Sequence, residues 1–258
     1  MSLDSLARAF ARRVLRGRVI RRRLPKSVGA AVVYVAPDSQ LKHLLPGVAG
    51  LDRNLIAWAQ SYVAAGDIVW DIGANCGVFA LAAAGLGAEV LAVEPDPFLV
   101  NTLLRARAAN PRLSLEILAA AIDGKCGIAT LEFAAGGRAS NALAGFAGRY
   151  VPFGRSTGRM LSPALRLDDL LTISVPTLVK LDIEGAELVA LRGATRLLAE
   201  IRPTLIVEVD SGLWGEATAF LDDAGYRLFD PDDPDRAIVA PLFNVLARPK
   251  QASVAPCD

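Results

Sequence analysis

The sequence predicts one α/β domain built on a parallel β-sheet with crossover helices. Three observations lead to this prediction. Short apolar runs alternate with segments of helical periodicity from residue 30 onward, the order that parallel strands joined by helices require. One of these runs leads directly into a glycine-rich turn, DIGANCG at 71–77. Hydrophobic residues make up 53% of the 258 residues, which is enough to bury one large core.

Strand-like and helix-like segments follow one another through the first half of the chain. The helix that begins at residue 51 is expected to end at Gly66, because glycine commonly terminates helices. Strands are expected over 30–36, 67–72, 88–95, 113–122 and 127–133, and helices over 51–66, 76–86 and about 97–110.

Residues 134–160 interrupt the alternation. They contain several glycines and no clear period, so we expect a loop that lies over the sheet. The alternation then resumes with strands over 177–183, 204–210, 226–229 and 241–247, and helices over 185–199 and 213–224. The last two strands flank the turn-rich sequence PDDPD and are expected to form an antiparallel pair at the edge of the sheet.

Cysteine usage and hydropathy indicate the cellular environment. Cys76, Cys126 and Cys257 are scattered and include no CxxC pair, so the sequence indicates neither a disulfide framework nor a zinc cluster. No apolar stretch reaches the roughly 18 residues that a membrane span needs. The N-terminus has arginines but no signal-peptide core. We therefore expect a soluble protein of the reducing cytoplasm.

Charge is distributed unevenly along the chain. Residues 1–26 carry nine basic side chains and one acidic side chain, whereas the rest carries 19 basic and 26 acidic ones. Leu3, Leu6, Phe10 and Val14 recur at the spacing of an amphipathic helix, with arginines over much of the remaining surface.

Two roles are open for this basic helix. It packs against the acidic domain of its own chain, or it binds an acidic partner or an anionic membrane surface, which would make the protein peripherally membrane-associated. The segment has no interleaved aromatic residues, so no nucleic-acid partner is expected. The oligomeric state is not determined by the sequence.

The glycine-rich turn indicates the charge of a bound cofactor. The turn lacks the G-x-G-x-x-G spacing of dinucleotide sites, and Asp71 immediately before it would repel a diphosphate. The same carboxylate would attract the ammonium and sulfonium groups of S-adenosylmethionine. Glu94 ends the next strand, where a carboxylate can accept hydrogen bonds from two ribose hydroxyls. A helix-capping role for Asp71 is disfavoured because the residue lies several positions before the helix.

Further motifs occur in the same order along the chain. They are EPDP at 94–97, LDDL at 167–170, KLDIEGAE at 180–187, LRGA at 191–194 and PTLIVE at 203–208. With DIGANCG, this set resembles the FkbM family of S-adenosylmethionine-dependent O-methyltransferases. The resemblance extends from about residue 50 to Pro249 and leaves out the basic N-terminus. Cys76 departs from the family, in which many relatives carry a larger or hydrophobic residue, and a small buried filler is the favoured interpretation.

The resemblance implies a fold, an activity and a division of the chain. The fold is the class I methyltransferase (Rossmann-like) fold, a seven-stranded, mostly parallel sheet with helices on both faces and an antiparallel last strand. The activity is methyl transfer to a hydroxyl of a sugar, glycolipid or secondary-metabolite acceptor. The chain divides into a basic, amphipathic helical extension (1–28), the methyltransferase domain (29–250) and a C-terminal tail (251–258). The expected cofactor-binding residues are Asp71, Gly73, Asn75, Gly77, Glu94 and Asp182.

A second group of charged residues follows two neighbouring strands. Strand alternation places Lys180, Asp182 and Glu184 on one side, and it groups Glu208 with Asp210. Methyl transfer requires alignment of the hydroxyl and removal of its proton. We expect Asp182 or Glu208 to accept this proton and Lys180 to balance the charge of the cluster.

Three alternatives to this mechanism stay open. Several carboxylates at the same end of the sheet could bind Mg²⁺. No metal is expected, and the sequence does not determine whether the activity requires one. The protein could bind S-adenosylmethionine without catalysis, as a scaffold in a biosynthetic assembly. N-methylation is disfavoured, because the sequence has KLDIE where N-methyltransferases have an NPPY-like motif.

Several other polar residues have simpler interpretations. Asp168 is expected to cap the helix that begins with DDLLT, and Glu187 to stabilise the N-terminus of the helix that follows the KLDIE strand. His43 is the only histidine of the chain, and a surface or packing role is favoured over a role as base. Ser140 and Asn141 lie in the expected loop and could hydrogen-bond cofactor or substrate.

Overall fold

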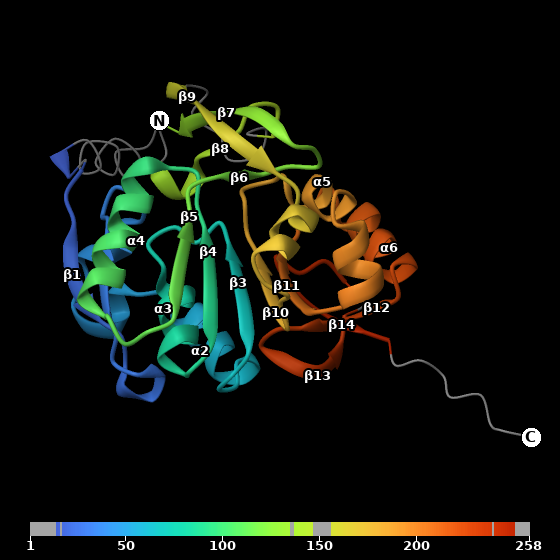
Figure 1. Ribbon diagram of the computed structural model, residues 1–258, viewed down its shortest axis with the longest axis horizontal. Coiled ribbons are helices and arrows are strands. Elements are labelled where there is room, and N and C mark those ends of the chain that lie inside the picture. The colour runs from blue at the N-terminus through green and yellow to red at the C-terminus, as the bar shows by residue number, and fades with distance from the viewer. Residues whose placement is uncertain (1–13, 16, 135–136, 147–155, 239, 251–258) are drawn as a thin grey trace, which may run out of the picture.

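The computed structural model describes residues 14–15, 17–134, 137–146, 156–238 and 240–250. The expected amphipathic helix falls mostly on residues 1–13, outside this part of the chain. A large sheet forms the centre of the molecule, and a smaller sheet lies above the carboxyl ends of its strands (Figure 1). Among the described residues, no helix combines the length and the apolar character needed to cross a membrane.

The large sheet has eight strands in the order β13-β12-β14-β11-β10-β3-β4-β5. The five strands from β11 to β5 are parallel, and β14 is antiparallel to both β11 and β12. The strands are β3 (Ile68–Ile72), β4 (Glu89–Val93), β5 (Leu115–Leu118), β10 (Leu178–Leu181), β11 (Thr204–Glu208), β12 (Tyr226–Asp230), β13 (Asp233–Ala237) and β14 (Asn244–Pro249). This arrangement confirms the class I methyltransferase fold, with β13 as an additional edge strand.

The expected antiparallel pair near the C-terminus is correct, but its place at the edge is not. β12 and β14 pair from Tyr226↔Pro249 to Phe229↔Leu246. β14, however, lies inside the sheet between β11 and β12, and the edge is formed by β13. The sequence PDDPD at 231–235 is therefore the turn and the first half of a short hairpin strand.

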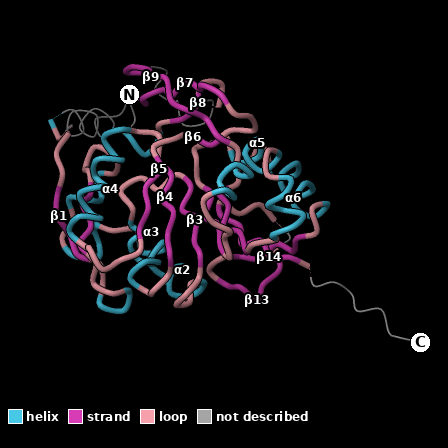
Figure 2. The backbone as a smooth tube through the Cα atoms, in the orientation of Figure 1, coloured by secondary structure: helices cyan, strands magenta, loops and turns pink. Residues whose placement is uncertain are grey.

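Alternating residues of the central strands pack against two helical layers, which Figure 2 shows on either side of the sheet. Val69 of β3 contributes to one core and Trp70 and Ile72 contribute to the other. The first core includes residues of α2 (Arg53–Tyr62), α3 (Val78–Gly85) and α4 (Pro97–Ala109). The second includes residues of the 3₁₀-helix Leu167–Thr172, α5 (Glu187–Arg192), the π-helical turn Leu197–Ile201 and α6 (Trp214–Asp223).

The helices deviate from the expected boundaries where glycines permit turns. Helix α2 ends at Tyr62, four residues before Gly66, which adopts a positive φ of 88° in the following turn. The single helix expected over 185–199 is divided into α5 and the π-helical turn. Gly193 separates the two, and a Cβ there would lie 3.0 Å from the Cα of Gly124.

The smaller sheet corrects two expectations. Its strands are β6 (Ala121–Ile122), β7 (Gly127–Ala134), β8 (Ala142–Leu143) and β9 (Ser156–Leu165), in the order β6-β9-β7-β8. The strand expected over 113–122 is therefore two strands, which belong to different sheets. The segment 134–160 is not simply a loop, because β9 begins at Ser156 and pairs with β7 along most of its length. Most of β9 is exposed, so its sequence lacks the apolar alternation of a half-buried strand.

A two-stranded sheet in the N-terminal part of the chain packs beside α4 (Figure 1). It consists of β1 (Ile20–Arg23) and β2 (Val32–Val35), which are antiparallel. Asn110 at the end of α4 exchanges two hydrogen bonds with the backbone of Val32, at 2.8 and 2.7 Å. Residues 20–23 are thus a strand within the segment that was expected to be a helical extension.

Asp168 stabilises a helical turn far along the chain rather than the one that contains it. This buried carboxylate accepts hydrogen bonds from Thr195 Oγ1, Arg196 N and Leu197 N at 2.9–3.0 Å. Its expected structural role is confirmed, but the amides it satisfies belong to the start of the π-helical turn Leu197–Ile201.

Replacing Asp168 with alanine should lower the free energy of unfolding by about 2 kcal/mol or more, because buried amides lose a charged acceptor. Glu116→Ala removes an exposed ion pair with Arg107 (3.1 Å) and should change it by less than about 0.5 kcal/mol. Urea denaturation of both variants measures the difference. Equal losses in the two variants would contradict the capping role of Asp168.

Candidate functional site

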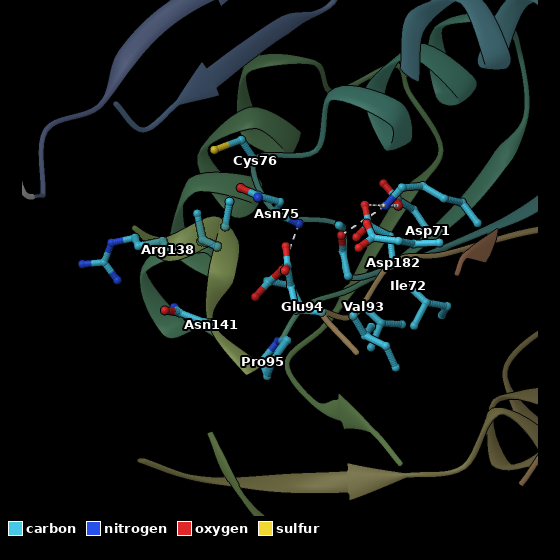
Figure 3. A pocket seen from close by; sticks show the side chains of 18 of the residues that line it. Asp71, Ile72, Asn75, Cys76, Val93, Glu94, Pro95, Arg138, Asn141 and Asp182 are labelled. Carbon is cyan, nitrogen blue, oxygen red and sulfur yellow. Dashed lines mark hydrogen bonds and ion pairs between the residues drawn. The ribbon is translucent and has the colours of Figure 1, made fainter. Parts of the chain in front are cut away.

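A cavity of about 500 Å³ lies at the carboxyl ends of the central strands. Its walls come from the glycine-rich turn after β3, the end of β4, the ends of β10 and β11, the segment 138–143 and the N-terminal segment around residues 40–58. Figure 3 shows Asp71 and Asp182 at one end of this site, Arg138 and Asn141 at the other, and Glu94 between them. The cavity therefore brings together side chains from widely separated parts of the sequence.

The glycine-rich turn is fixed by close backbone contacts. Gly73 has φ of 76°, and a Cβ there would lie 1.8 Å from the backbone oxygen of Asp182. Gly77 has φ of 79° and packs on Leu103, so its role in this structure is to start α3 rather than to line the cavity. The turn thus brings the ends of β3 and β10 into direct contact.

Asp71 is fully buried, and one of its oxygens forms an ion pair while the other accepts a hydrogen bond. Oδ1 lies 3.1 Å from the ammonium of Lys180, and Oδ2 accepts a hydrogen bond from the amide of Ala80 at 3.0 Å. The rejection of a capping role for Asp71 was therefore wrong. The turn curves back so that Asp71 reaches the third residue of α3 despite its distance in sequence.

Lys180 connects the two strand ends. Its ammonium lies 3.1 Å from Asp71, 3.3 Å from Asp182 and 3.3 Å from the backbone oxygen of Gly73. Burial by itself lowers the pKa of Lys180, but the two carboxylates outweigh burial and the net shift is upward. Lys180 therefore stays charged, whereas burial raises the pKa of Asp71.

Glu208 is the partner of Asp182 across neighbouring strands. It is buried at the end of β11, whereas the side chain of Asp182 is 32% exposed. Burial, the charge of Asp182 and a hydrogen bond between the two side chains raise the pKa of Glu208 to about 10. These surroundings thus favour the protonated form of Glu208 beside Asp182. Burial also raises the pKa of the nearby Glu184 to about 8.

Glu94 is held in one orientation by backbone amides. Its Oε2 accepts from the amide of Asn75 at 2.8 Å and its Oε1 accepts from the amide of Asp96 at 2.9 Å. Burial raises its pKa to about 7. The side chain of Asn75 is also engaged, because its Oδ1 accepts from the hydroxyl of Ser39 at 2.8 Å. Each carboxylate oxygen of Glu94 keeps a further lone pair for a ligand.

The sequence interpretation missed Arg138, which organises the end of the site near Glu94. Its guanidinium pairs with Asp38 (3.0 Å) and with Asp96 (2.8 Å) and lies 4.1 Å from the centre of the Phe98 ring. Asn141 donates to the same Asp96 at 2.9 Å. Only the polar sequence GGRASN signals this cluster, and polar loops are common without any function.

The N-terminal segment supplies a wall that the sequence interpretation also missed. Five of its residues line the cavity in addition to His43, and Phe243 faces it from the C-terminal side; the five are Gln40, Asp52, Asn54, Leu55 and Trp58. His43 Nδ1 lies 2.7 Å from the backbone oxygen of Gly50, and burial lowers its pKa. The imidazole is therefore neutral, and Nδ1 carries the proton.

The remaining candidate residues have structural roles. Cys76 is buried beside the cavity, which fits a small filler, and burial raises its thiol pKa to about 12. Glu187 accepts hydrogen bonds from the amides of Ile183 and Gly185 and so holds the turn before α5. Asp210 accepts from the amide of Gly212. Within the described part of the chain, no group of three or more His, Cys, Asp or Glu side chains is arranged to hold a metal ion.

Comparisons with known proteins identify relatives of this domain. A family model described as "Methyltransferase FkbM domain" matches residues 71–228. No curated protein matches the chain significantly.

Three solved structures of methyltransferases are similar to this chain. Methyltransferase FkbM from Methylobacillus flagellatus KT is 22% identical with a TM-score of 0.47, over 71% of this chain and 43% of that chain. A TehB-like SAM-dependent methyltransferase from Corynebacterium glutamicum is 15% identical with a TM-score of 0.44, over 79% and 91%. Pyrococcus abyssi tRNA (uracil-54, C5)-methyltransferase, in complex with S-adenosyl-L-homocysteine, is 13% identical with a TM-score of 0.49, over 89% and 43%. This chain thus spans less than half of the Methylobacillus protein.

The protonation of Glu208 predicts a pH-dependent contribution to stability. The unfolded chain loses this proton near the ordinary glutamate pKa of 4.5, whereas the folded protein keeps it up to about pH 10. The folded state binds more protons in between, so the stability from this group falls as the pH rises through that window, by at most about 1.4 kcal/mol per pH unit.

Glu208→Gln removes the titration but can still donate to Asp182. The free energy of unfolding of this variant, relative to that of the wild type, should therefore increase from pH 5 to pH 9. Urea denaturation at several pH values measures the gain, and Glu116→Gln at an exposed site serves as control. Parallel stability curves for wild type and Glu208→Gln would show that Glu208 is ionised in the folded protein.

Proposed function

The chain belongs to the FkbM family of methyltransferases, and from this premise we propose that it transfers a methyl group from S-adenosylmethionine to a hydroxyl of a sugar, glycolipid or secondary-metabolite acceptor. The observation that carries the proposal is the Asp182–Glu208 carboxyl pair beside buried Lys180, which stands at the mouth of the cavity. Such a pair can receive the proton that a hydroxyl loses during methylation.

The residues around the turn fit S-adenosylmethionine. Glu94 is oriented by the amides of Asn75 and Asp96, and its remaining lone pairs suit the two ribose hydroxyls of the cofactor. The Asp182 side chain is 32% exposed and can face the cationic end of the cofactor, whereas Asp71 is buried against Lys180 and the amide of Ala80. Gly73 allows the turn to pack on the backbone of Asp182, where a Cβ would collide. When bound, the cofactor supplies a methyl group on a sulfonium, which is a good leaving group.

We assign the proton transfer to Asp182 rather than to Glu208. Glu208 is buried at the end of β11 and is therefore less accessible to a substrate hydroxyl than Asp182. Asp182 is partly exposed to the cavity, and its orientation is set by the ammonium of Lys180 at 3.3 Å and by Glu208. Because an alcohol is far more basic than a carboxylate, Asp182 accepts the proton as the new C–O bond forms, not before.

We call the side chains that line the cavity outside the family domain the acceptor wall. They favour a substrate that has both polar and apolar surface. Gln40, Asn54 and neutral His43 offer hydrogen-bonding groups, and Trp58 and Phe243 offer aromatic surface. A sugar ring combines hydroxyls with apolar faces and so matches this mixture. All five residues lie outside residues 71–228, the part of the chain that matches the family model.

A labelled-methyl assay tests the proposed function. Purified protein and S-adenosylmethionine carrying a labelled methyl group are incubated with extracted sugars, glycolipids and secondary metabolites. The proposal predicts label in a product heavier than its acceptor by one methylene group, with the label on oxygen. Label on nitrogen or carbon, or S-adenosylmethionine binding with no transfer to any acceptor class, would contradict it.

Asp182→Asn should reduce the rate of methyl transfer about 100-fold or more, because the variant cannot accept the hydroxyl proton. Its affinity for S-adenosylmethionine should change by less than about tenfold. Glu208→Gln is the matched control, since it imitates the protonated side chain and should keep most of the activity. Loss of activity in Glu208→Gln with near-normal turnover in Asp182→Asn would assign the base to Glu208.

Glu94→Gln should weaken the binding of S-adenosylmethionine and S-adenosylhomocysteine by about 10- to 100-fold. The side-chain NH₂ of the glutamine would face the backbone N–H of Asn75 or Asp96, and two donors cannot hydrogen-bond each other. The side chain would therefore lose the orientation that the two backbone N–H groups give the carboxylate of Glu94. Titration calorimetry measures the affinity, and Glu116→Gln should bind as the wild type does. Unchanged affinity in Glu94→Gln would remove Glu94 from the cofactor site.

A further inference from the structure

An apolar segment is exposed close to the cavity. Residues 44–49, LLPGVA, all lie at the surface, in the 3₁₀-helices Leu41–Leu44 and Gly47–Gly50 and the turn between them. The side chains of Leu44, Leu45 and Val48 are 45%, 50% and 39% exposed. Contiguous exposed apolar patches are typical of interaction sites. We call residues 44–49 the apolar loop.

The apolar loop is held in place by polar contacts at its base. The guanidinium of Arg22 donates to the backbone oxygens of His43 (3.2 Å) and Leu45 (3.5 Å). His43 contacts the backbone oxygen of Gly50 at 2.7 Å, and Lys42 pairs with Asp52 at 2.5 Å. The loop therefore presents its leucines from a fixed base.

Positive charge adjoins the apolar loop. Arg22 of β1 contacts the loop directly, and Arg18, Arg21, Arg23 and Lys26 are exposed on the segment around it in the sequence, with Arg21 and Arg23 on the opposite face of the strand from Arg22. Residues 17–37 contain no acidic side chain. Asp52, the acidic residue at the base of the loop, is neutralised by Lys42. An apolar loop that contacts Arg22 and follows a basic segment of the chain is complementary to a surface with negatively charged groups outside an apolar layer.

We propose that the apolar loop inserts into the interface of an anionic lipid bilayer while the neighbouring basic residues contact lipid phosphates. Apolar side chains supply the insertion energy, and basic side chains supply attraction to anionic headgroups, which acts over about 10 Å at 0.1 M salt. A purely apolar protein partner would not explain the basic residues, and a purely acidic partner would not explain the exposed leucines.

This orientation points to the location of the substrate. Gln40 and His43 line the cavity from the segment that leads into the apolar loop. Insertion of the loop would thus bring the acceptor wall close to the membrane surface. Within the proposed function, the acceptor is then a hydroxyl on a lipid-anchored molecule, such as the sugar of a glycolipid. The membrane contact itself does not depend on that function.

Vesicle sedimentation tests the membrane contact without cofactor or acceptor. The full chain is mixed with vesicles of phosphatidylcholine alone or of phosphatidylcholine with phosphatidylglycerol. Wild type should bind the anionic vesicles at least tenfold more tightly than the neutral ones, and binding should weaken as salt is raised. The double variant Leu44→Asp/Leu45→Asp should lose at least tenfold of this affinity.

A matched control separates the loop from a general change of charge. Ile173 and Val175 are 53% and 47% exposed, and Thr177 just after them pairs with the first residue of β3 at the amino ends of the strands. Ile173→Asp/Val175→Asp adds the same two charges there and should bind vesicles as the wild type does. Circular dichroism verifies that both double variants are folded.

Three outcomes would overturn the proposal. Wild type that fails to bind anionic vesicles, or binds neutral ones equally well, excludes the anionic bilayer. Equal vesicle binding by wild type and Leu44→Asp/Leu45→Asp, or equal losses in both double variants, excludes the loop. A wild-type dimer that Leu44→Asp/Leu45→Asp dissociates in size-exclusion chromatography, without vesicle binding by wild type, assigns the loop to self-association. Because turnover is not measured, these results stay independent of the methyl-transfer test.

Discussion

The buried ammonium of Lys180 is the interaction on which the rest of the site depends. Lys180 and Asp71 are direct partners in the parallel register of β10 and β3, so the ion pair joins the two central strands at their ends. The same ammonium contacts Asp182 and the backbone oxygen of Gly73. A buried charge is costly unless it is paired, and removing one partner leaves the other unpaired. The strand ends, the glycine-rich turn and Asp182 are consequently held in one arrangement.

Around this ion pair, carboxyl groups of similar chemistry differ in protonation because their surroundings differ. Glu208 is buried beside the charge of Asp182 and keeps its proton, whereas Asp182 faces Lys180 and the cavity. Glu94 is also buried, but two backbone amides stabilise its ionised form and keep its pKa near 7. Environments that separate the pKa values of neighbouring carboxyl groups give one fold both a proton donor and a proton acceptor. The carboxyl groups at the strand ends therefore have different roles in proton transfer.

Segments outside the family domain complete the molecule. The N-terminal segment forms one wall of the cavity, and Arg22 joins its first strand to the apolar loop. A bridge from Asp38 to Arg138 ties the same segment to the loop beside Glu94. Changes in acceptor or in membrane contact could thus occur without change to the glycine-rich turn or to the strands that carry Asp71 and Asp182. The proposed chemistry and the proposed recognition are carried by separate parts of the chain.

The sequence by itself determined the order of the central strands and helices, the glycine-rich turn and the placement of Asp71, Glu94 and Asp182 at strand ends. These features follow from local periodicity and from glycine positions, which report what each residue faces within its own element. Only the tertiary structure decided that β9 pairs with β7, that Asp71 caps α3, that Glu208 keeps its proton and that the N-terminal segment walls the cavity. Each of these depends on burial and on distances between elements, which arise when the chain folds and leave no local periodicity in the sequence.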